Sequence, residues 1–472
     1  MKMWSGRFRQ PLDPEFERWQ RSFGFDRRLL PYELAASAAH ARALKNAGIL
    51  SADELIEILQ GLEKIGERAV SSPAFLDDPD AEDVHHFVER QLVALIGDLG
   101  YKLHSGRSRN EQIATDLRLY VRAAIDQLRH ELAELCTAFA DRAEQSADSA
   151  MPAYTHLQRA EPVLVGHWLL AYVEMFLRDA DRLADCRKRL NACPLGSGAV
   201  AGATLALDRS LMADALEFDS PTANSLDATS DRDFVIEFVN ALSLLAVHLS
   251  RWAEEMILFS SEEYGFLGLP EAYSTGSSAM PQKKNPDLLE LVRGKSSRII
   301  AHAAALLITV KGLPLAYNKD LQETQEALFD SADTLISMLP LITGWMKSVE
   351  LHPDRMHQAA QSGFMNAWAA ATYLVQRGVP SRLAHEKIGS AVKLCLEKKC
   401  ELKDLPLAEL QLLSPAFAAD FYESLQLHSV LAIHDVPGGT APARVRQALS
   451  SARSKIHSLR EEVRDQKTHA HA

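Results

Sequence analysis

Apolar residues recur at three- and four-residue steps along five long stretches of this chain. They cover residues 110–147, residues 163–189, residues 235–259, residues 288–310, and a stretch from Leu321 to a break at Pro340. This spacing places the apolar side chains on one face of an α-helix, and helices of such length bury those faces most easily against each other. Strands of alternating polarity are scarce. The pattern therefore predicts an all-α fold built on an elongated bundle of long helices.

Breaks in this pattern divide the chain into three parts. Residues 1–109 hold shorter helical patterns, at 31–46 and 51–68, and a segment rich in proline and aspartate comes after them. Residues 110–352 carry the long helices. Residues 353–472 return to short helices interrupted by proline and glycine. We therefore expect a central long-helix bundle flanked by smaller, mainly helical N-terminal and C-terminal domains.

The charge balance narrows the classes of partner. The 472 residues include 51 Lys and Arg against 63 Asp and Glu, which gives a formal net charge of −12. An acidic surface repels phosphate backbones and anionic lipids, so it argues against nucleic acid and membrane as partners. The most apolar stretches, such as residues 299–310, are interrupted or shorter than the roughly 20 apolar residues that a membrane span needs.

The cysteines point to a reducing compartment. There are five, an odd number, and none is spaced as a CxxC pair or a Cys/His ligand set, so the sequence predicts neither a disulfide framework nor a metal site. The first residues carry charge without the apolar region of a signal peptide behind them. We expect a cytoplasmic protein.

The most unusual segment covers residues 273–287 and reads YSTGSSAMPQKKNPD. Its small and turn-forming residues predict a mobile loop, and its last three residues open the helix that begins near Leu288. Hydroxyl groups, free backbone N–H groups and Lys283 beside a helix N-terminus form a site for an anion, or for a reaction that builds negative charge. An ordinary flexible surface loop explains the composition equally well.

Three other segments combine chemically active side chains with the ends of long helices. His156 lies in the turn-like stretch 154–162, and histidine is the commonest general acid and base. Arg109 and Asn110 precede a long helix, where an arginine fork binds carboxylates. Residues 317–323 mix tyrosine, amides and charge. Each segment alone is a weak signal, and a solvated turn explains each one as well. The ends of bundle helices converge either within one chain or between neighbouring chains.

The sequences of these segments resemble those of the fumarase/aspartase superfamily and, within it, of the argininosuccinate lyases. The resemblance extends from WSGRF at residues 4–8 to PGGTAPARVRQAL near the end, and the C-terminal third matches more loosely. The motifs are long and occur in order. They are HSGRSRN (104–110), YTHLQRAEP (154–162), PLGSGAVAG (194–202), DATSDRDF (227–234), GSSAMPQKKNP (276–286) and YNKDLQE (317–323).

The resemblance implies a fumarase/aspartase-like fold and the cleavage of argininosuccinate to L-arginine and fumarate, the last step of arginine biosynthesis. It implies that Ser277 is the catalytic base, and that Lys283 and Asn285 stabilise the carbanion that proton removal leaves. It also implies that His156, oriented by Glu290, assists proton transfer to the departing guanidinium nitrogen, either directly or through water. It calls for no metal and no organic cofactor.

The resemblance further implies that the enzyme is a homotetramer and that residues from three subunits complete each active site. Around the substrate it places Ser22, Arg109, Asn110, Thr155, Asn285, Tyr317, Gln322 and Gln325.

At one of these positions the chain departs from the family pattern. The family usually has lysine where this sequence has Gln325. If that lysine binds a substrate carboxylate, glutamine keeps a hydrogen bond but loses a charge, which weakens binding by about 1–2 kcal/mol. A raised KM with intact chemistry is therefore expected.

Two alternatives remain open at this point. One is another fumarate-releasing lyase, chiefly adenylosuccinate lyase. The other is a helical scaffold without catalysis, like the eye-lens crystallins that resemble this family.

Overall fold

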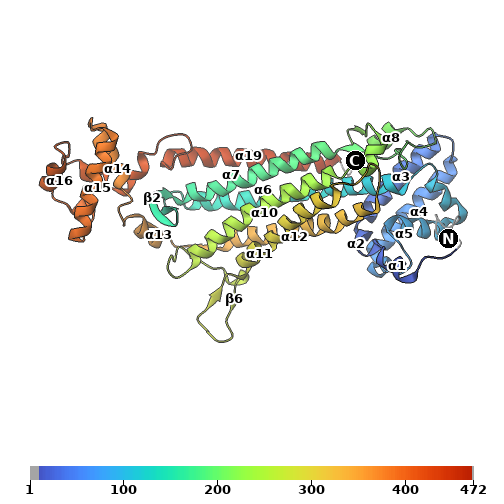
Figure 1. The fold of residues 1–472 in the computed structure, drawn as a ribbon, viewed down its shortest axis with the longest axis horizontal. Coiled ribbons are helices and arrows are strands. Elements are labelled where there is room, and N and C mark those ends of the chain that lie inside the picture. The colour runs from blue at the N-terminus through green and yellow to red at the C-terminus, as the bar shows by residue number, and fades with distance from the viewer. Residues whose placement is uncertain (1–9, 470–472) are drawn as a thin grey trace.

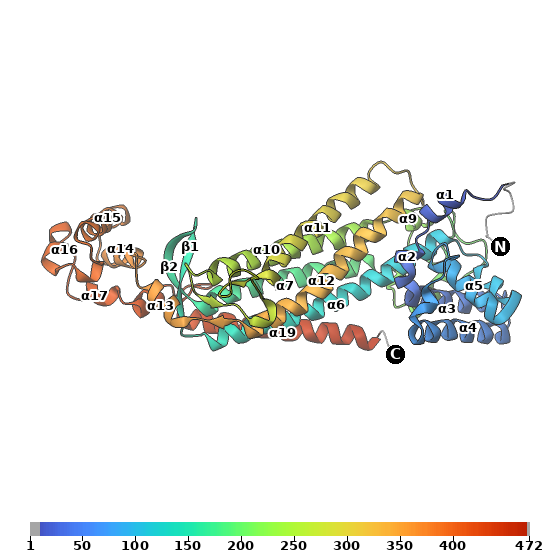
Figure 2. The same cartoon turned by 90° about the horizontal axis from the view of Figure 1, so that it is seen from below.

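The protein is an elongated helical molecule with a different group of helices at each end of a long bundle (Figure 1). The structure, a computed structural model, describes residues 10–469, so the motif at residues 4–8 lies outside the described residues. Both views place the N-terminal helices at one end of the bundle and the helices α14 to α17 at the other (Figures 1 and 2). The predicted all-α class is confirmed.

The N-terminal end is a group of short helices whose starts are specified locally. Ser51 and Glu54 form a capping box before α4, and the side chain of Asp83 accepts a hydrogen bond from a backbone N–H in the first turn of α5. The elements here are α1 (Pro14–Trp19), α2 (Phe23–Asp26), η2 (Arg27–Leu29), α3 (Leu30–Asn46), α4 (Ala52–Ser71), η3 (Pro73–Leu76), α5 (Val84–Ile96) and η4 (Gly97–His104).

Long helices that pack on one another through their apolar faces form the central bundle. Four of the five predicted long helices match the structure to within a few residues. The fully buried Phe139, Phe176 and Trp252 meet in the shared core of α6, α7 and α10. The bundle helices are α6 (Arg109–Gln145), α7 (Val165–Leu190), α10 (Asp233–Ser260), α11 (Asp287–Val310), α12 (Glu323–Ser348) and α19 (Pro442–His469).

The fifth prediction was wrong about where its helix ends. The sequence pattern predicted a break at Pro340, but α12 continues through this residue to Ser348. Proline removes one backbone donor from a helix interior, a cost that normally ends or kinks the helix. Here Leu339, Ile342 and Trp345 around the proline are all buried in the bundle, so tertiary packing outweighs the local loss.

One helix contradicts the expectation that no apolar stretch of this chain is long enough to span a membrane. Among the described residues, α10 has the length and hydropathy of a membrane span, with 44% of its most apolar window buried inside the chain. Packing of α10 against α7, α11 and α12 accounts for that buried part. A helix in the core of a soluble protein can have the same length and hydropathy, so these two properties alone do not indicate a membrane span.

The C-terminal end has a hydrophobic core of its own. Tyr373, Phe417 and Phe421 stack there against Leu374 and Ile388. The chain then returns, and α19 packs along α6 and α7 in the bundle. The expected domain boundaries at residues 109 and 352 stay predictions. The C-terminal elements before α19 are α13 (Pro353–Ala360), α14 (Ala367–Gln376), α15 (Ser381–Lys398), η7 (Leu402–Asp404), α16 (Leu407–Leu413), α17 (Phe421–Ser424) and α18 (Leu427–Ala432).

Small sheets and short helices make the connections. Each sheet in the described part of the chain has two strands. The pairs are β1 (Ala150–Thr155) with β2 (Gln158–Leu164), β3 (Ala192–Cys193) with β4 (Ser220–Pro221), β5 (Leu267–Gly268) with β8 (Glu350–Leu351), and β6 (Thr275–Gly276) with β7 (Lys284–Asn285). Two of these sheets, β1 with β2 and β6 with β7, contain predicted site residues. The remaining short helices are α8 (Arg209–Ala215), α9 (Ser225–Ser230), η5 (Glu271–Tyr273) and η6 (Lys319–Gln322).

Candidate active site

Two of the predicted substrate residues are held by buried carboxylates where α6 meets the N-terminal helices. The hydroxyl of Ser22 donates to Asp26 Oδ2 at 2.6 Å, and Arg109 Nη1 donates to Asp83 Oδ2 at 2.8 Å. Asp26 also accepts from the backbone N–H of Val84 at 3.1 Å. One side of the Arg109 fork is therefore fixed, and its Nε is buried without a hydrogen-bond partner among the described residues.

The two carboxyl groups that hold Ser22 and Arg109 carry different charge. Burial, and next the negative charge of Asp83, raise the pKa of Asp26 to about 7. Burial also acts to raise the pKa of Asp83, but the nearby Arg109, and after it His85, hold it below its ordinary value. Asp83 is therefore the ionised partner of Arg109. Neither Asp26 nor Asp83 was predicted as a site residue, because nothing in the local sequence distinguishes them from acidic residues at a protein surface.

Tyr317 and Gln322 join this cluster from the start of α12. The pKa of Tyr317 is raised by burial, and the charges that act on it include Arg232, Asp83 and Arg109. Gln322 donates its amide to the backbone carbonyl of Gln20 at 3.2 Å, which ties the start of α12 to the segment before Ser22.

Arg232 is a cation in this region that the sequence analysis missed. It is 1% exposed, and its Nε and Nη2 have no hydrogen-bond partner among the described residues. Burial lowers its pKa to about 10, against the opposing charges of Tyr317 and Asp231. A buried guanidinium with free donors is costly unless a ligand anion completes it. The signal was available in the motif DATSDRDF, which contains this one basic residue.

Gln325 lies one turn further along the buried face of α12. It is 3% exposed, and its Oε1 has no hydrogen-bond donor within the described chain. Asn110, in the first turn of α6, is half-buried. The structure thus brings together Ser22, Arg109, Tyr317 and Gln322, with the positions of Asn110 and Gln325 on the same two helix starts.

His156 occupies the tip of the hairpin formed by β1 and β2, which the sequence analysis described only as a turn. Thr155 pairs with Gln158, so His156 and Leu157 are the two central residues of the turn. Both have positive φ, 56° and 57°, as the favoured two-residue hairpin turn requires. Residues other than glycine are strained in this conformation, and such strain concentrates at functional sites. Thr155 and His156 are both exposed.

Ser277 lies in the loop between β6 and β7, which projects away from the bundle (Figure 1). Its Oγ accepts hydrogen bonds from the backbone N–H groups of Ala279 at 3.3 Å and Met280 at 3.1 Å. Two donors directed at one hydroxyl oxygen stabilise negative charge on that oxygen. The predicted loop, and the helix that begins just after it, are confirmed.

The other predicted loop residues flank Ser277 on β7 and at the start of α11. The amide of Asn285 donates to the carbonyl of Gly276 at 3.3 Å, which closes the base of the loop. Asp287 accepts from the N–H and the hydroxyl of Thr275 at 3.0 and 2.7 Å. The side chains of Lys283 and Glu290 are exposed, so they are free to meet another molecule.

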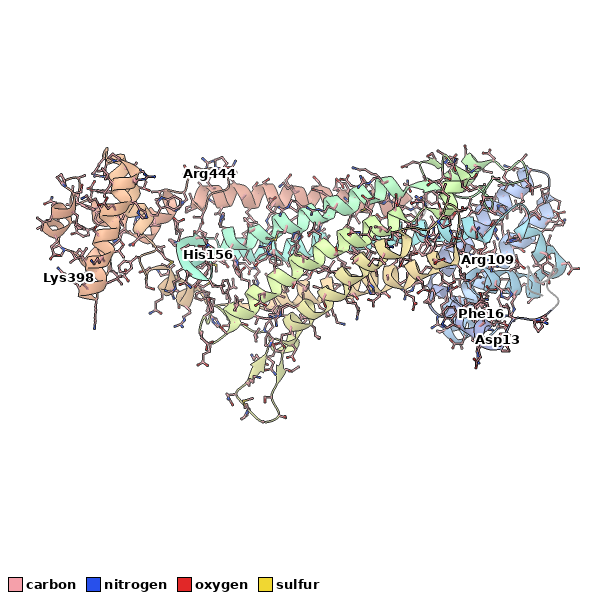
Figure 3. The ribbon with its side chains drawn as sticks, in the orientation of Figure 1. Asp13, Phe16, Arg109, His156, Lys398 and Arg444 are labelled. Atoms are coloured by element: carbon pink, nitrogen blue, oxygen red, sulfur yellow. The ribbon has the colours of Figure 1, made fainter. Side chains whose placement is uncertain are left out.

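Within one chain the group around Arg109 lies apart from the other two groups. Arg109 and His156 sit at opposite ends of the bundle (Figure 3), and the 37 residues of α6 between them span roughly 55 Å. The 24 residues of α11 separate the Ser277 loop from Tyr317 by roughly 36 Å. No hydrogen bond or ion pair joins His156 to Glu290 among residues 10–469. Both distances exceed the length of any small metabolite.

An open cleft of about 760 Å³ lies beside the hairpin, lined by residues that include Leu157, Arg159, Tyr264 and Arg355. The guanidinium of Arg159 is already engaged, because it donates to Ser362 Oγ at 2.8 Å and to the carbonyl of Ala359 at 3.3 Å. None of the predicted catalytic residues lines this cleft. It is therefore not the place where the three groups meet.

Comparison with known proteins covers nearly the whole chain. A model of the lyase family matches residues 6–301, and a model of the argininosuccinate lyase C-terminal family matches residues 364–432. Among solved structures, an EDDS lyase in complex with formate has a TM-score of 0.84 at 26% identity and covers 98% of this chain and 93% of its own. A 3-carboxy-cis,cis-muconate lactonizing enzyme from Pseudomonas putida, with a TM-score of 0.73 at 20% identity, shares the fold.

Curated relatives are more similar still. The argininosuccinate lyase of Koribacter versatilis is 60% identical over 98% of this chain and 99% of its own length. That of Acidobacterium capsulatum is 58% identical over 97% of this chain and 96% of its own length. Both matches extend over nearly the whole chain, and the C-terminal family model matches residues 364–432. The chain belongs to the argininosuccinate lyase family.

Proposed function

We propose that this protein cleaves argininosuccinate to L-arginine and fumarate by base-catalysed elimination across a C–N bond. The observation that carries the proposal is the 60% identity over 98% of the chain to a protein named argininosuccinate lyase. The geometry of the three residue groups supports it, because each group supplies a different part of an elimination. The Ser277 loop supplies a base, the His156 hairpin supplies an acid, and the cluster around Arg109 binds carboxylates.

The proton is removed by Ser277. Its Oγ takes the proton from the carbon next to a succinyl carboxylate, and the electron pair of that C–H bond spreads into the carboxylate as a dianion. The backbone N–H groups of Ala279 and Met280 stabilise the alkoxide form of Ser277 that this step needs. Closure of the projecting loop over the substrate removes water and strengthens these interactions.

Lys283 and Asn285 stabilise the dianion, since both lie within eight residues of Ser277 on the same hairpin. When the C–N bond breaks, its electron pair leaves with the guanidinium nitrogen, and the carbon pair becomes the double bond of fumarate. His156, oriented by Glu290, assists proton transfer to that nitrogen. The lack of contact between the two side chains in one chain supports their pairing between subunits.

The cluster at the start of α6 holds the substrate carboxylates and polar groups. Arg109 offers the positive charge of a guanidinium that Asp83 holds in place, and Tyr317 and Gln322 add neutral donors. Arg232 adds a buried guanidinium whose Nε and Nη2 have no hydrogen-bond partner among the described residues, and it supplies cationic charge that Gln325 cannot. The net charge of −12 is in this view a property of the outer surface, because the site itself is rich in cations.

We infer that the working unit is a homotetramer with sites shared between subunits. Spans of roughly 55 and 36 Å within one chain support this inference, because only another copy brings the Arg109 group to a Ser277 loop and a His156 hairpin. The exposed face of α11 supports it as well. Ile300, Leu307 and Ile308 are 43%, 52% and 64% exposed, and their spacing places them within about 100° of one another around the helix axis. An exposed apolar patch of this kind marks an interface. A cytoplasmic location is part of the proposal, and the five cysteines support it because their odd number and spacing predict no disulfide framework.

One assay tests the proposed reaction. Purified protein incubated with argininosuccinate is expected to release arginine and fumarate in equal amounts, while adenylosuccinate is not cleaved. Replacing Ser277 with alanine is expected to abolish turnover and to leave the assembly intact. Cleavage of adenylosuccinate instead, or a chain that cleaves neither compound, would assign the protein to another lyase or to a scaffold. Full activity in the Ser277→Ala variant would remove this residue from the base step.

A further inference from the structure

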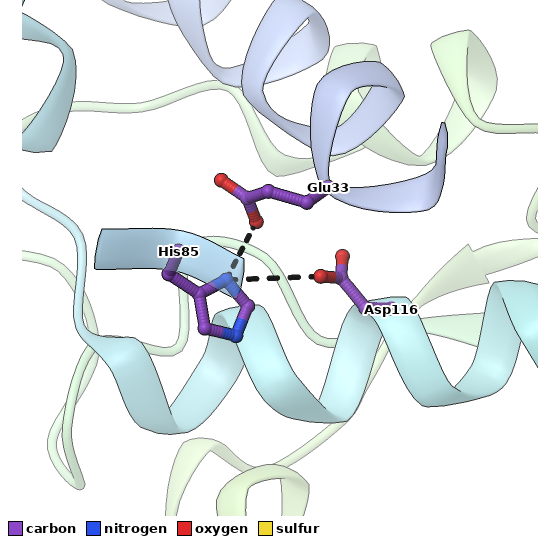
Figure 4. Close-up of side chains that lie close together, drawn as sticks. All are labelled: Glu33, His85 and Asp116. Atoms are coloured by element: carbon purple, nitrogen blue, oxygen red, sulfur yellow. Dashed lines mark hydrogen bonds and ion pairs between the residues drawn. The ribbon is translucent and has the colours of Figure 1, made fainter. Parts of the chain in front are cut away.

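A cluster of buried ionisable side chains lies beneath the substrate-binding end of the bundle. His85 Nδ1 lies 2.8 Å from Glu33 Oε2 and 3.7 Å from Asp116 Oδ2, and all three side chains are at most 2% exposed (Figure 4). They come from α5, α3 and α6 respectively. The cluster therefore lies where the bundle helix α6 meets α3 and α5 of the N-terminal end.

Donors surround Glu33. It accepts from Ser37 Oγ at 2.6 Å, from Gln112 Nε2 at 3.1 Å and from His85 Nδ1 at 2.8 Å. Arg107 Nη1 lies 3.8 Å from the same carboxylate. Although burial acts to raise its pKa, the charges of His85 and Arg107 hold the pKa of Glu33 below its ordinary value. Glu33 is the ionised carboxylate of the cluster.

Asp116 has the opposite surroundings. It is 0% exposed, and neither of its oxygens meets a hydrogen-bond donor among the described residues. A buried carboxylate without donors costs several kcal/mol. The charge of Glu33 next to it adds repulsion, since two carboxylates at one site do not both ionise. Burial, and next the negative charge of Glu33, raise the pKa of Asp116 well above its ordinary value. The charge of Arg107 acts to lower this pKa, and the charge of Asp26 acts to raise it.

We propose that Asp116 is a protonated carboxylic acid that hydrogen-bonds to Glu33, and that this acid–carboxylate pair positions the first turns of α6. A proton on Asp116 supplies the donor that its surroundings lack, and the acceptor is the neighbouring carboxylate. The pair thereby replaces a repulsion by a charge-assisted hydrogen bond.

A metal ion is the competing explanation for two carboxyls and a histidine in contact. The donors around Glu33 argue against it. Ser37, Gln112 and His85 fill three of the roughly four acceptor positions of Glu33, which leaves one for the proton of Asp116, and the guanidinium of Arg107 lies beside them. A divalent ion prefers carboxylates whose oxygens face an open position.

The pair is well placed to hold the substrate end. Asp116 lies two helical turns after Arg109 on α6, so both face the N-terminal helices. His85 follows Asp83, the partner of Arg109, by two residues. Anchoring α6 to α3 and α5 at Asp116 fixes the distance between Arg109 and Asp83. Asp116 is thus a positioning residue for the proposed substrate site.

Infrared spectroscopy tests the protonation state directly. A neutral carboxylic acid has a C=O stretch that a carboxylate lacks. The difference spectrum of wild type minus Asp116→Asn at pH 8 is expected to contain this band. A difference spectrum with only carboxylate bands would overturn the proposal. This measurement requires no turnover, so it stands or fails independently of the proposed lyase activity.

Chemical unfolding of two matched variants is the second test. Asp116→Asn keeps a donor of the same shape, so it is expected to fold like wild type. Because the folded pKa of Asp116 is above its unfolded value, wild type loses stability as pH rises above the unfolded pKa, and the variant does not. The ratio of the wild-type to the variant unfolding constant should therefore rise between pH 5 and pH 8, by up to about tenfold per pH unit.

Glu33→Gln removes the carboxylate from the same cluster and is expected to increase the unfolding constant by about a hundredfold or more. If this variant does not fold, the loss of stability is larger still, which also agrees with the proposal. Equal losses in Asp116→Asn and Glu33→Gln, or a pH-independent ratio for Asp116→Asn, contradict the proposal.

Kinetics test the positioning part, which rests on the proposed function. Asp116→Ala removes the donor and is expected to raise KM for argininosuccinate about fivefold while kcat changes less than about twofold, and Asp116→Asn should restore KM. A parallel fall of kcat in both variants would contradict a positioning effect. Stabilisation of wild type by Zn²⁺ or Mn²⁺ that disappears in Asp116→Asn would replace the acid–carboxylate pair with a metal site.

Discussion

Gly344 on α12 is a position where one methyl group should displace the loop that carries the proposed base. A Cβ added to Gly344 would lie 2.0 Å from the hydroxyl oxygen of Tyr273 and 3.0 Å from ring carbon Cζ. Tyr273 ends η5, four residues before Ser277. Alanine therefore forces Tyr273 to move, and the start of the loop moves with it.

Two energies of opposite sign act on the Gly344→Ala variant. Overpacking costs about 1–3 kcal/mol, whereas replacing glycine inside a helix gains about 0.5–1 kcal/mol. Overpacking outweighs the gain, so the free energy of unfolding should fall by up to about 2 kcal/mol. A displacement of about 1 Å near a reacting group costs up to about a hundredfold in rate, so kcat/KM for argininosuccinate should fall by about ten- to a hundredfold.

Fumarate release and denaturant unfolding measure both effects. Adding Tyr273→Phe removes the oxygen at 2.0 Å and leaves the ring at 3.0 Å, so the double variant should regain most of the lost activity. Gly389→Ala on α15 is the matched control, because nothing lies within 4 Å of the added Cβ. The control should gain about 0.5–1 kcal/mol at unchanged activity. A Gly344→Ala enzyme with wild-type kcat/KM and raised stability would refute this packing argument.

Three further predictions concern the substrate end. Gln325→Lys restores a charge next to the substrate and should lower KM by about five- to thirtyfold, measured from initial rates; an unchanged kcat/KM would contradict the charge-loss account. Arg232→Met should raise KM by about tenfold or more while the free energy of unfolding stays equal or rises, because the variant removes a buried guanidinium with unmet donors. A fall in stability at unchanged KM would make Arg232 a structural residue. The pKa of Asp26, raised to about 7, means that its protonated form favours the fold. Stability should therefore be lost as pH rises from about 4 through 7, and urea midpoints of Asp26→Asn should lack that part of the loss; an identical pH dependence in wild type and variant would contradict it.

The fold was predictable wherever packing and local pattern agree. The stripe on α10 has no glycine or proline inside, and the predicted helix matches the observed one to within two residues at each end. Pro340 misled the sequence reasoning because the local cost of proline is visible in the sequence, whereas the buried contacts of α12 beyond it are not. The hairpin of β1 and β2 was missed for a similar reason, since its turn uses His156 and Leu157 instead of glycine or asparagine.

The site was predictable as a set of segments and less so as an arrangement. Ser277 and Arg109 were identified through distinctive wording, and local geometry supports a function for each. Arg232, Asp26 and Asp83 were missed because their importance comes from burial and from the neighbours that folding brings to them. The proposed pairing of His156 with Glu290 requires a second copy of the chain, which a single sequence does not describe.

The central claim is that each active site takes its base from one subunit and its histidine from another. Ser277→Ala and His156→Asn are each expected to be inactive as pure proteins. When the two variants are unfolded together in equal amounts and refolded, each site has an even chance of drawing an intact Ser277 and an even chance of drawing an intact His156. About one quarter of the sites should then be active, measured as fumarate release against wild type. A mixture as inactive as either variant alone would place Ser277 and His156 in the same chain's site and contradict the account.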